Sequence, residues 1–283
     1  MSTATLRLPG IEQLDLDAYC ERIGYRGART PTLATLRELH WHHVSAIPFE
    51  NLTSLAGEPV TLEPAALQAK MVHGRRGGYC YEQNVLFAAV LQRLGFRVTG
   101  LAARVVWNLA PGAGNPRSHM LLRLELPEGN HIADVGFGSA SLPGPLRLVT
   151  GLTQPTPIEP YRLVEHDEGY QLELQLPEGW RPVYTFDLQP QQFVDYQLAN
   201  WFVSTSPASR FVQVLMAARP AGTLRRTLLD AEFALRPLAG EPQRRRLGGV
   251  AELRRVLAAE FGIDVPASAR MDAALERVAA RRS

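Results

Sequence analysis

A cysteine stands where a glycine-rich turn meets the start of a predicted helix. Residues 76–84 read Arg-Gly-Gly-Tyr-Cys-Tyr-Glu-Gln-Asn, and apolar residues then recur at helical spacing as far as Gly95, a natural helix stop. This pattern places Cys80 in the first turn of the helix. There, unpaired backbone N–H groups and the positive end of the helix dipole favour the thiolate, so Cys80 is a candidate nucleophile. The two glycines before it allow another backbone or a ligand to approach closely.

A histidine and an aspartate on two predicted strands could activate this thiol. Residues 118–126 predict one strand, and residues 131–138 predict a second that runs into a glycine-rich loop. A four-residue turn between them puts Asp134 diagonal to His119 on the same face, with the backbones roughly 7–8 Å apart. A shift of one residue would put the two side chains on opposite faces. In the expected register, His119 takes the Cys80 proton and Asp134 fixes the imidazole tautomer.

Each of these residues also has an ordinary structural role. A cysteine is commonly a small buried apolar residue. A single strand histidine is commonly a hydrogen-bonded structural residue, and an aspartate beside a glycine is commonly a turn residue. The joint placement of Cys80, His119 and Asp134 favours a nucleophilic site over these three separate roles.

Parts of the chain with different periodicities must position the three residues. Residues 1–94 are mainly helical in pattern and carry the nucleophile. Residues 95–190 alternate between short apolar runs and turns, which is typical of strands, and carry the histidine and the aspartate. Residues 191–283 mix both patterns. The sequence therefore predicts an α+β fold with a helical bundle, a β-rich part and a mixed lid.

Individual elements follow from the spacing of apolar residues and from capping residues. Helices are expected near 15–23, 32–45, 64–71, 191–200 and 250–261. Beyond the β-rich part, strand-like segments are expected at 211–217 and 225–235. The arginine run at 244–246 is expected in a solvated loop, because it is short and glycines follow it.

Composition agrees with an enzyme that has a large core. The chain has 283 residues, 46% hydrophobic content and a net charge of +2. Charges of both signs are dispersed, so no nucleic-acid surface is predicted, and no apolar stretch is long enough to span a membrane. Cys20 is expected to be buried in a helix and not to pair with Cys80. A free catalytic thiol fits a reducing cytoplasm.

Other motifs that could bind ligands are incomplete. His40 and His43 share a helix face, but no third ligand stands nearby, so no metal site is expected. Residues 136–141 begin like a dinucleotide-binding loop, yet Ser141 occupies the third glycine position and no helix is expected directly after it. Residues 73–78 lack the lysine of a phosphate-binding loop. Metal, nicotinamide and nucleotide-hydrolysis functions are therefore not favoured.

Several separated motifs, in the right order, resemble those of the arylamine N-acetyltransferases. The resemblance covers most of the chain, and one departure is Tyr81, which stands where phenylalanine is frequent. The matching segments are 19–25, 47–52, 76–84, 103–105, 118–120, 134–138, 195–196, 200–202 and 204–207.

This resemblance implies a helical bundle, a β-barrel and an α/β lid, with the site at the junction of the first two. It implies roles as acetylated nucleophile, base and third triad member for Cys80, His119 and Asp134. It implies an acceptor pocket lined by Phe137, Gly138 and Phe202. Both phenylalanines also fit as plain core residues.

The reaction implied by the resemblance is a ping-pong transfer with acetyl-coenzyme A (acetyl-CoA) as co-substrate and no metal. Cys80 attacks the thioester, releases CoA and passes the acetyl group to an arylamine, an arylhydrazine or a related amine. A thiolate exchanges readily with a thioester, and backbone N–H groups near Cys80 would stabilise the tetrahedral intermediates. Contact with the CoA phosphates is an alternative role for the arginine run at 244–246.

Two other functions are compatible with these residues. An amide synthase that closes a macrolactam resembles the same family and keeps the triad, with a carrier-bound polyketide in place of acetyl-CoA. A polyketide gene cluster beside the gene would favour it. A non-catalytic protein that binds amines or CoA belongs to a different class, and an unreactive Cys80 would favour that class. The oligomeric state and the physiological acceptor remain open at this level.

Overall fold

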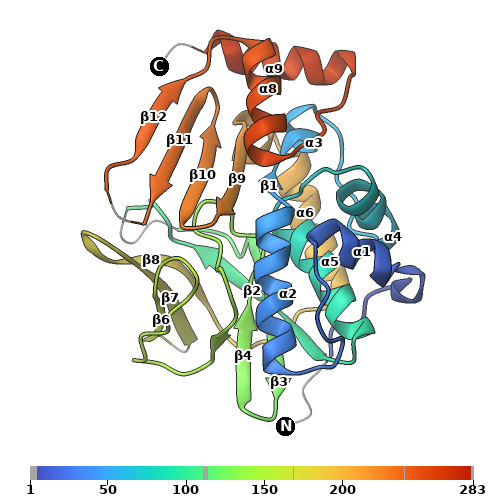
Figure 1. Cartoon of the computed structure of the whole chain (residues 1–283), viewed down its shortest axis with the longest axis vertical. Coiled ribbons are helices and arrows are strands. Elements are labelled where there is room, and N and C mark those ends of the chain that lie inside the picture. The colour runs from blue at the N-terminus through green and yellow to red at the C-terminus, as the bar shows by residue number, and fades with distance from the viewer. Residues whose placement is uncertain (1–4, 111–113, 168, 239, 282–283) are drawn as a thin grey trace.

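The computed structural model describes residues 5–110, 114–167, 169–238 and 240–281. Two antiparallel sheets lie beside a group of helices (Figure 1). The α-helices are α1 (Leu16–Ile23), α2 (Leu33–Ala46), α3 (Leu52–Leu55), α4 (Pro64–Leu67), α5 (Cys80–Arg93), α6 (Phe193–Thr205), α7 (Arg210–Gln213), α8 (Val250–Phe261) and α9 (Ala269–Ala280). Tighter or wider helical turns are η1 (Ile11–Gln13) and η2 (Gln68–His73).

The strands follow the chain from β1 to β12. Their bounds are β1 (Phe49–Glu50), β2 (Arg97–Val105), β3 (His119–Leu126), β4 (Gly129–Ala133), β5 (Leu146–Arg147), β6 (Tyr161–His166), β7 (Gly169–Leu176), β8 (Gly179–Phe186), β9 (Met216–Ala221), β10 (Leu224–Leu229), β11 (Glu232–Pro237) and β12 (Gln243–Arg246).

Capping residues set the ends of the predicted helices in the first part of the chain. Asp15 precedes α1 and accepts backbone N–H bonds of 2.9 Å from Asp17 and Ala18, as an N-cap aspartate does. Thr32 caps α2 by accepting from the Thr35 N–H at 3.2 Å. After α5 the chain turns at Gly95, whose φ of 89° lies in the left-handed region that glycine adopts without strain. The expected helices at 15–23 and 32–45 are confirmed.

The β-rich part forms a nearly closed barrel. In the described chain, its sheet has seven strands in the order β5-β4-β3-β2-β8-β7-β6. Strands β3 and β4 form a hairpin whose partners run from Leu126↔Gly129 to Leu122↔Ala133. This is the register expected from a four-residue turn. The predicted second strand is shorter than expected, since β4 ends at Ala133 and leaves Asp134 as the first residue of the following loop.

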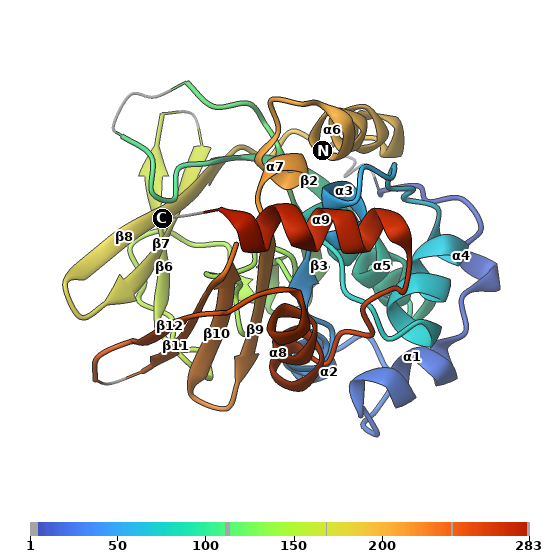
Figure 2. The same ribbon diagram turned by 90° about the horizontal axis from the view of Figure 1, so that it is seen from above.

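The second sheet joins residues far apart in the sequence. Its strand order is β1-β9-β10-β11-β12, and β1 pairs with β9 through Phe49↔Ala218. Helices α8 and α9 cover one face of this sheet (Figure 2). Leu253, Phe261 and Leu275 from these helices pack into its core. We call this second sheet the lid sheet. Its strand β1 connects it to the helical part of the chain.

Three expectations for the last part of the chain are wrong. The segment 211–217 is not one strand, because Ser209 caps the short helix α7 by accepting from the Phe211 N–H at 3.2 Å. The segment 225–235 is a hairpin of β10 and β11, because the chain reverses at Asp230, which has a φ of 47°. The arginines at 244–246 lie in the edge strand β12, paired with β11, and not in a loop. Helix α9 was not foreseen.

Helix α6 follows the barrel in the chain but packs against the helical part. Its Tyr196 and Val203 belong to the same buried cluster as the apolar residues of α5. The expected helix at 191–200 is confirmed and extends to Thr205. The division of the chain at residues 94 and 190 remains a prediction.

Candidate active site

Cys80 lies at the first position of α5, directly after a tight turn. The turn is packed so closely that a Cβ on Gly77 would lie 2.0 Å from the carbonyl oxygen of Pro48. The Gly78 carbonyl accepts the Glu50 N–H at 3.1 Å, and the Gly78 N–H donates to Pro48 at 3.3 Å. The glycines therefore permit the close backbone approach that the sequence predicted, and this approach fixes the start of α5.

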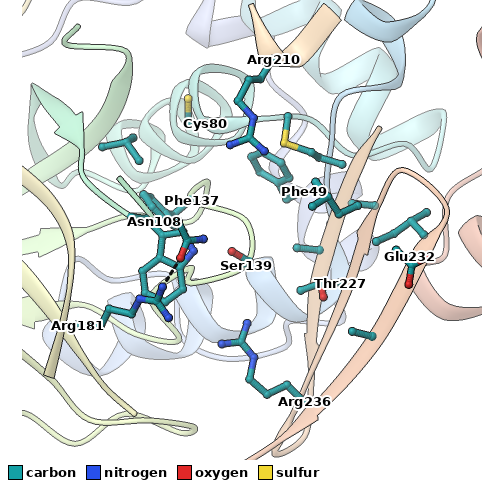
Figure 3. A pocket seen from close by; sticks show the side chains of 18 of the residues that line it. Phe49, Cys80, Asn108, Phe137, Ser139, Arg181, Arg210, Thr227, Glu232 and Arg236 are labelled. Atoms are coloured by element: carbon teal, nitrogen blue, oxygen red, sulfur yellow. Dashed lines mark hydrogen bonds between the residues drawn. The ribbon is translucent and has the colours of Figure 1, made fainter. Parts of the chain in front are cut away.

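The Cys80 thiol is 3% exposed and contributes to the wall of a cavity (Figure 3). The Cys80 Sγ lies 3.8 Å from the carbonyl oxygen of Ser118. Ser118 directly precedes His119, so this contact brings the start of α5 against the start of β3. Cys80 and the strand that begins with His119, the predicted base, thus meet at the junction of the helical part and the barrel.

His119 and Asp134 form the hydrogen bond that the predicted register requires. The His119 Nε2 lies 2.7 Å from the Asp134 Oδ2, and both side chains are buried. The imidazole packs against two aromatic rings, with ring centroids 5.2 Å away for Phe137 and 5.1 Å away for Tyr184. With Nε2 occupied by the carboxylate, the Nδ1 atom is the ring nitrogen left for exchange of a proton with Cys80.

The pair is ionised in the folded protein. Burial alone would lower the pKa of His119, but the Asp134 carboxylate outweighs it, and with a smaller contribution from Cys80 raises the pKa to about 10. Burial alone would raise the pKa of Asp134, but the charge and hydrogen bond of His119 hold it below its usual value. At neutral pH an imidazolium therefore faces the Cys80 side chain.

Asn84 connects the three segments that carry these residues. It lies one turn after Cys80 on α5, and its Nδ2 donates to the Met120 carbonyl of β3 at 2.8 Å. The same Nδ2 donates to the Asp134 Oδ1 at 3.0 Å, and the Asn84 Oδ1 accepts the Val135 N–H at 3.1 Å. No role for Asn84 was predicted from the sequence. Asn84 follows Cys80 by four residues, which places both side chains on one helix face. This spacing could have indicated that Asn84 lies near the site.

Buried ion pairs support the turn before Cys80. The chain's one lysine, Lys70, donates to the Glu82 carboxylate at 2.5 Å, and Glu82 accepts the Tyr79 N–H at 3.1 Å. Glu50 accepts from Arg76 at 2.8 Å and from the Leu52 N–H at 2.6 Å. These charges have partners, as buried charges require, and they order the backbone on both sides of Cys80.

The cavity in front of Cys80 has a volume of about 1390 Å³. It lies between the barrel, which contributes Asn108 and Arg181, and the lid sheet, which contributes Thr227 and Arg236 (Figure 3). Of the predicted pocket residues, Phe137 and Phe202 line it. Gly138 does not: it is buried against the Phe49 ring, where a Cβ would lie 3.2 Å from ring carbons. Phe49 itself lines the cavity and was not foreseen.

Gly136 allows the Asp134 loop to lie directly on the Cys80 backbone. A Cβ at this position would lie 2.7 Å from the Cys80 Cα and 3.0 Å from the Cys80 carbonyl oxygen. We expect Gly136→Ala to lower the turnover of the enzyme by about 100-fold, because a displacement of about 1 Å is enough for such a loss. We also expect a loss of about 1–3 kcal/mol in the free energy of unfolding from overpacking.

Steady-state kinetics and urea unfolding would measure both effects. The matched control is Gly144→Ala, because a Cβ on Gly144 would have nothing within 4 Å. The control should keep both the turnover and the stability. Wild-type turnover in the Gly136 variant would contradict the close packing of this loop on Cys80.

Comparison with known proteins identifies the family. A family model described as N-acetyltransferase matches residues 32–270. The arylamine N-acetyltransferase of Mycobacterium tuberculosis is 45% identical over 256 residues, which are 89% of this chain and 90% of that protein. The chain belongs to the arylamine N-acetyltransferase family. As a member of this N-acetyltransferase family, it is an acyltransferase.

Other relatives agree with this assignment. The arylamine N-acetyltransferase of Escherichia coli is 40% identical over 88% of this chain and 89% of that protein. The structure of the Mycobacterium marinum arylamine N-acetyltransferase in complex with CoA superimposes with a TM-score of 0.90 at 41% identity, and covers 93% of this chain and 99% of that one. Acetyl-CoA is the co-substrate of arylamine N-acetyltransferases, and the helical bundle, barrel and lid of this chain are their fold.

The described residues contain neither a metal-binding group nor a membrane-spanning helix. Within residues 5–110, 114–167, 169–238 and 240–281, no group of three or more histidine, cysteine or acidic side chains is arranged to hold a metal ion. Across the same ranges, none of the helices is both long and apolar enough to cross a membrane.

Proposed function

We propose that the protein transfers an acetyl group from acetyl-CoA to the nitrogen of arylamines or arylhydrazines through an acetyl-Cys80 intermediate. The observation that carries this proposal is the arrangement of one buried thiol and one ionised His119–Asp134 pair beside a large cavity. Membership of the family supports the acetyl donor and the amine acceptor. The two free cysteines of the chain suit a reducing cytoplasm, which is part of the proposal.

The proposed first half-reaction forms a thioester on the enzyme. The Cys80 thiolate attacks the acetyl carbonyl carbon, and the tetrahedral intermediate collapses as the C–S bond to CoA breaks. His119 supplies a proton to the departing CoA thiolate, and Asp134 keeps the imidazole oriented for that transfer. The products are acetyl-Cys80, free CoA and a neutral His119.

The proposed second half-reaction passes the acetyl group to the amine. The amine nitrogen attacks the acetyl carbonyl of the thioester, and the neutral His119 accepts a proton from that nitrogen. The C–S bond to Cys80 breaks, which restores the thiolate and the imidazolium. Protons therefore balance over the two half-reactions, since His119 loses one to CoA and gains one from the amine.

The lining of the cavity supports both substrates. Phe137 and Phe202 line it and offer flat apolar surfaces for an aromatic acceptor. Arg210 and Arg236 extend into it from opposite sides (Figure 3). We propose these two arginines as contacts for the CoA phosphates, because a guanidinium pairs well with phosphate oxygens. The exposed Arg244 of β12 also lines the cavity and can extend this positive surface.

The proposal is tested by the intact mass of the protein after incubation with acetyl-CoA and no amine. We expect one added acetyl group, which peptide mapping places on Cys80 and which an arylamine then removes. Prior alkylation of Cys80 with iodoacetamide should prevent the addition. A reactive Cys80 that takes no acetyl group would contradict the acetyl donor and favour the amide synthase. An inert Cys80 would favour a binding protein.

A further inference from the structure

His40 contacts the backbone of Asp134 from a helix that carries none of the proposed catalytic residues. It belongs to α2, its side chain is 0% exposed, and its Nε2 lies 3.3 Å from the Asp134 backbone nitrogen. The N–H of Asp134 is the donor in this contact, so the His40 Nε2 must carry a lone pair and not a proton. The two residues are 94 positions apart in the sequence.

The geometry of the sheet explains why Asp134 needs such an acceptor. In an antiparallel hairpin, alternate residues direct their N–H groups away from the partner strand. In β4, Asn130 and Ile132 face outward: the Asn130 carbonyl accepts the Leu148 N–H at 2.8 Å, and Ile132 pairs with Leu146 of β5. Asp134 continues this outward series, but in the described chain the pairing of β5 stops at Ile132. The His40 ring replaces the missing strand.

The surroundings of His40 keep its ring neutral and in place. Burial is the largest influence and lowers its pKa to about 3, and the charge of Asp134 opposes this effect while that of His43 adds to it. The ring lies edge-on to Phe87, with centroids 5.7 Å apart. A neutral ring that accepts at Nε2 carries its proton on Nδ1, which is buried and has no hydrogen-bond partner among the described residues. An apolar side chain at this position would leave no unpaired N–H group. The advantage of a histidine over an apolar residue is therefore the Nε2 atom that accepts the Asp134 N–H.

His43, one turn further along α2, has a different role. Its Nδ1 lies 2.7 Å from the Tyr19 hydroxyl and its Nε2 lies 2.6 Å from the Gln83 Oε1. Gln83 in turn donates to the Pro48 carbonyl at 2.8 Å. His43 therefore supports the turn before Cys80, and His40 alone of the two reaches the Asp134 loop.

We propose that His40 is a positioning residue whose Nε2 accepts the Asp134 N–H and thereby fixes the carboxylate that holds His119. This inference depends on the proposed roles of Cys80, His119 and Asp134. If the acceptor is lost, the Asp134 N–H loses its partner and the loop shifts. The Asp134 Oδ2 then moves from His119, and the imidazolium that stabilises the Cys80 thiolate is weakened.

Two amide substitutions of His40 test whether the length of the side chain, and not only its polarity, is needed for the contact with the Asp134 N–H. In His40→Gln, the Oε1 stands as many bonds from the backbone as the His40 Nε2 does, so it can accept the Asp134 N–H. In His40→Asn, the side chain has the same amide group but is one carbon shorter and cannot reach. We expect the asparagine variant to lose about 10- to 100-fold in kcat/KM, as a small displacement of a catalytic group does. We expect the glutamine variant to keep most of the wild-type value.

The decisive measurement is the rate of Cys80 alkylation by iodoacetamide as a function of pH. If His119 is less well held by Asp134, the alkylation rate of His40→Asn should rise about one pH unit higher than that of the wild type. This shift corresponds to about a tenfold change in thiolate population. The glutamine profile should match that of the wild type. Thermal unfolding checks that each variant is folded. If the asparagine variant keeps the wild-type profile and only its melting temperature falls, His40 is a structural residue and the inference is wrong.

This experiment stays informative if the proposed acetyl transfer fails. Alkylation requires neither acetyl-CoA nor an amine, so it measures the His40 effect even if acetyl-Cys80 never forms. Conversely, a wild-type protein that forms acetyl-Cys80, combined with an asparagine variant that behaves like it, would overturn the inference and leave the proposed function intact. A glutamine variant as impaired as the asparagine variant would also overturn it, because reach would then not matter.

Discussion

Replacement of Asp134 by asparagine is expected to lower kcat/KM for acetyl transfer by about 10⁴-fold. The Asp134 Oδ1 accepts from the Asn84 Nδ2 at 3.0 Å and from the Gly136 N–H at 2.9 Å. These donors will hold the single carbonyl oxygen of the asparagine at the Oδ1 position. Its NH₂ group then faces the His119 Nε2, which must accept a hydrogen bond. The ring proton moves to Nδ1, on the side of Cys80, in the wrong tautomer for accepting a proton.

The same substitution changes how stability depends on pH. The pKa of His119 is raised from 6.5 to about 10, so the pair stabilises the native state fully below pH 6.5. That contribution is lost as the pH rises through 10. The pKa of Asp134 is lowered from 3.8, so its contribution is present above pH 3.8 and is lost as the pH falls through the native value. In the Asp134→Asn variant, the stability loses both of these pH-dependent contributions.

Kinetics and melting temperatures between pH 6 and pH 10 would check both expectations. The wild-type melting temperature should fall over this range, and that of the Asp134→Asn variant should fall less. Asp17→Asn is the matched control, because Asp17 is 83% exposed and pairs with Arg29 on the surface. A variant with wild-type kcat/KM would show that the carboxylate does not orient His119.

The contact between His119 and Asp134 could be predicted because it depends on local rules. A four-residue turn sets the pairing of β3 with β4, and side chains alternate faces along each strand. The position of Cys80 was equally accessible, since glycines followed by a helical apolar repeat mark a helix start. The observed bounds of α8 match the expected 250–261 for the same reason.

Contacts between distant segments could not be predicted in this way. The bridge of Asn84 to Met120 and Val135 depends on how α5 lies on the barrel. The contact of His40 with Asp134 depends on where β5 stops. No local spacing encodes either distance. The pairing of β1 with β9 is similar, because a two-residue strand has too little pattern to be recognised in the sequence.

The strands expected at 211–217 and 225–235 were predicted wrongly because single residues there override the apolar pattern. Ser209 starts the short helix α7 within a run of apolar residues that resembles a strand. Asp230 adopts a left-handed φ and divides one apolar run into two strands. In each case a local backbone conformation decided the outcome.

Replacement of Cys80 by serine is expected to abolish turnover, with a loss of roughly 10⁴-fold or more. A serine nucleophile needs a neutral histidine to remove its proton. In this site the pKa of His119 is about 10, mainly because the Asp134 carboxylate opposes the effect of burial, so the ring is protonated at neutral pH. It cannot act as a base toward a hydroxyl. It suits a thiolate, which has already given up its proton.

Single-turnover assays with acetyl-CoA would compare Cys80→Ser with Cys80→Ala, and the two variants should be equally inactive. Cys20→Ser is the matched control, because Cys20 is buried in α1 and does not line the cavity. It should keep the activity of the folded enzyme even if its stability falls. A serine variant that retains more than about one per cent of the wild-type rate would mean that His119 is neutral in the resting enzyme. The site would then work by general-base catalysis, and the ion pair inferred from the buried carboxylate would be wrong.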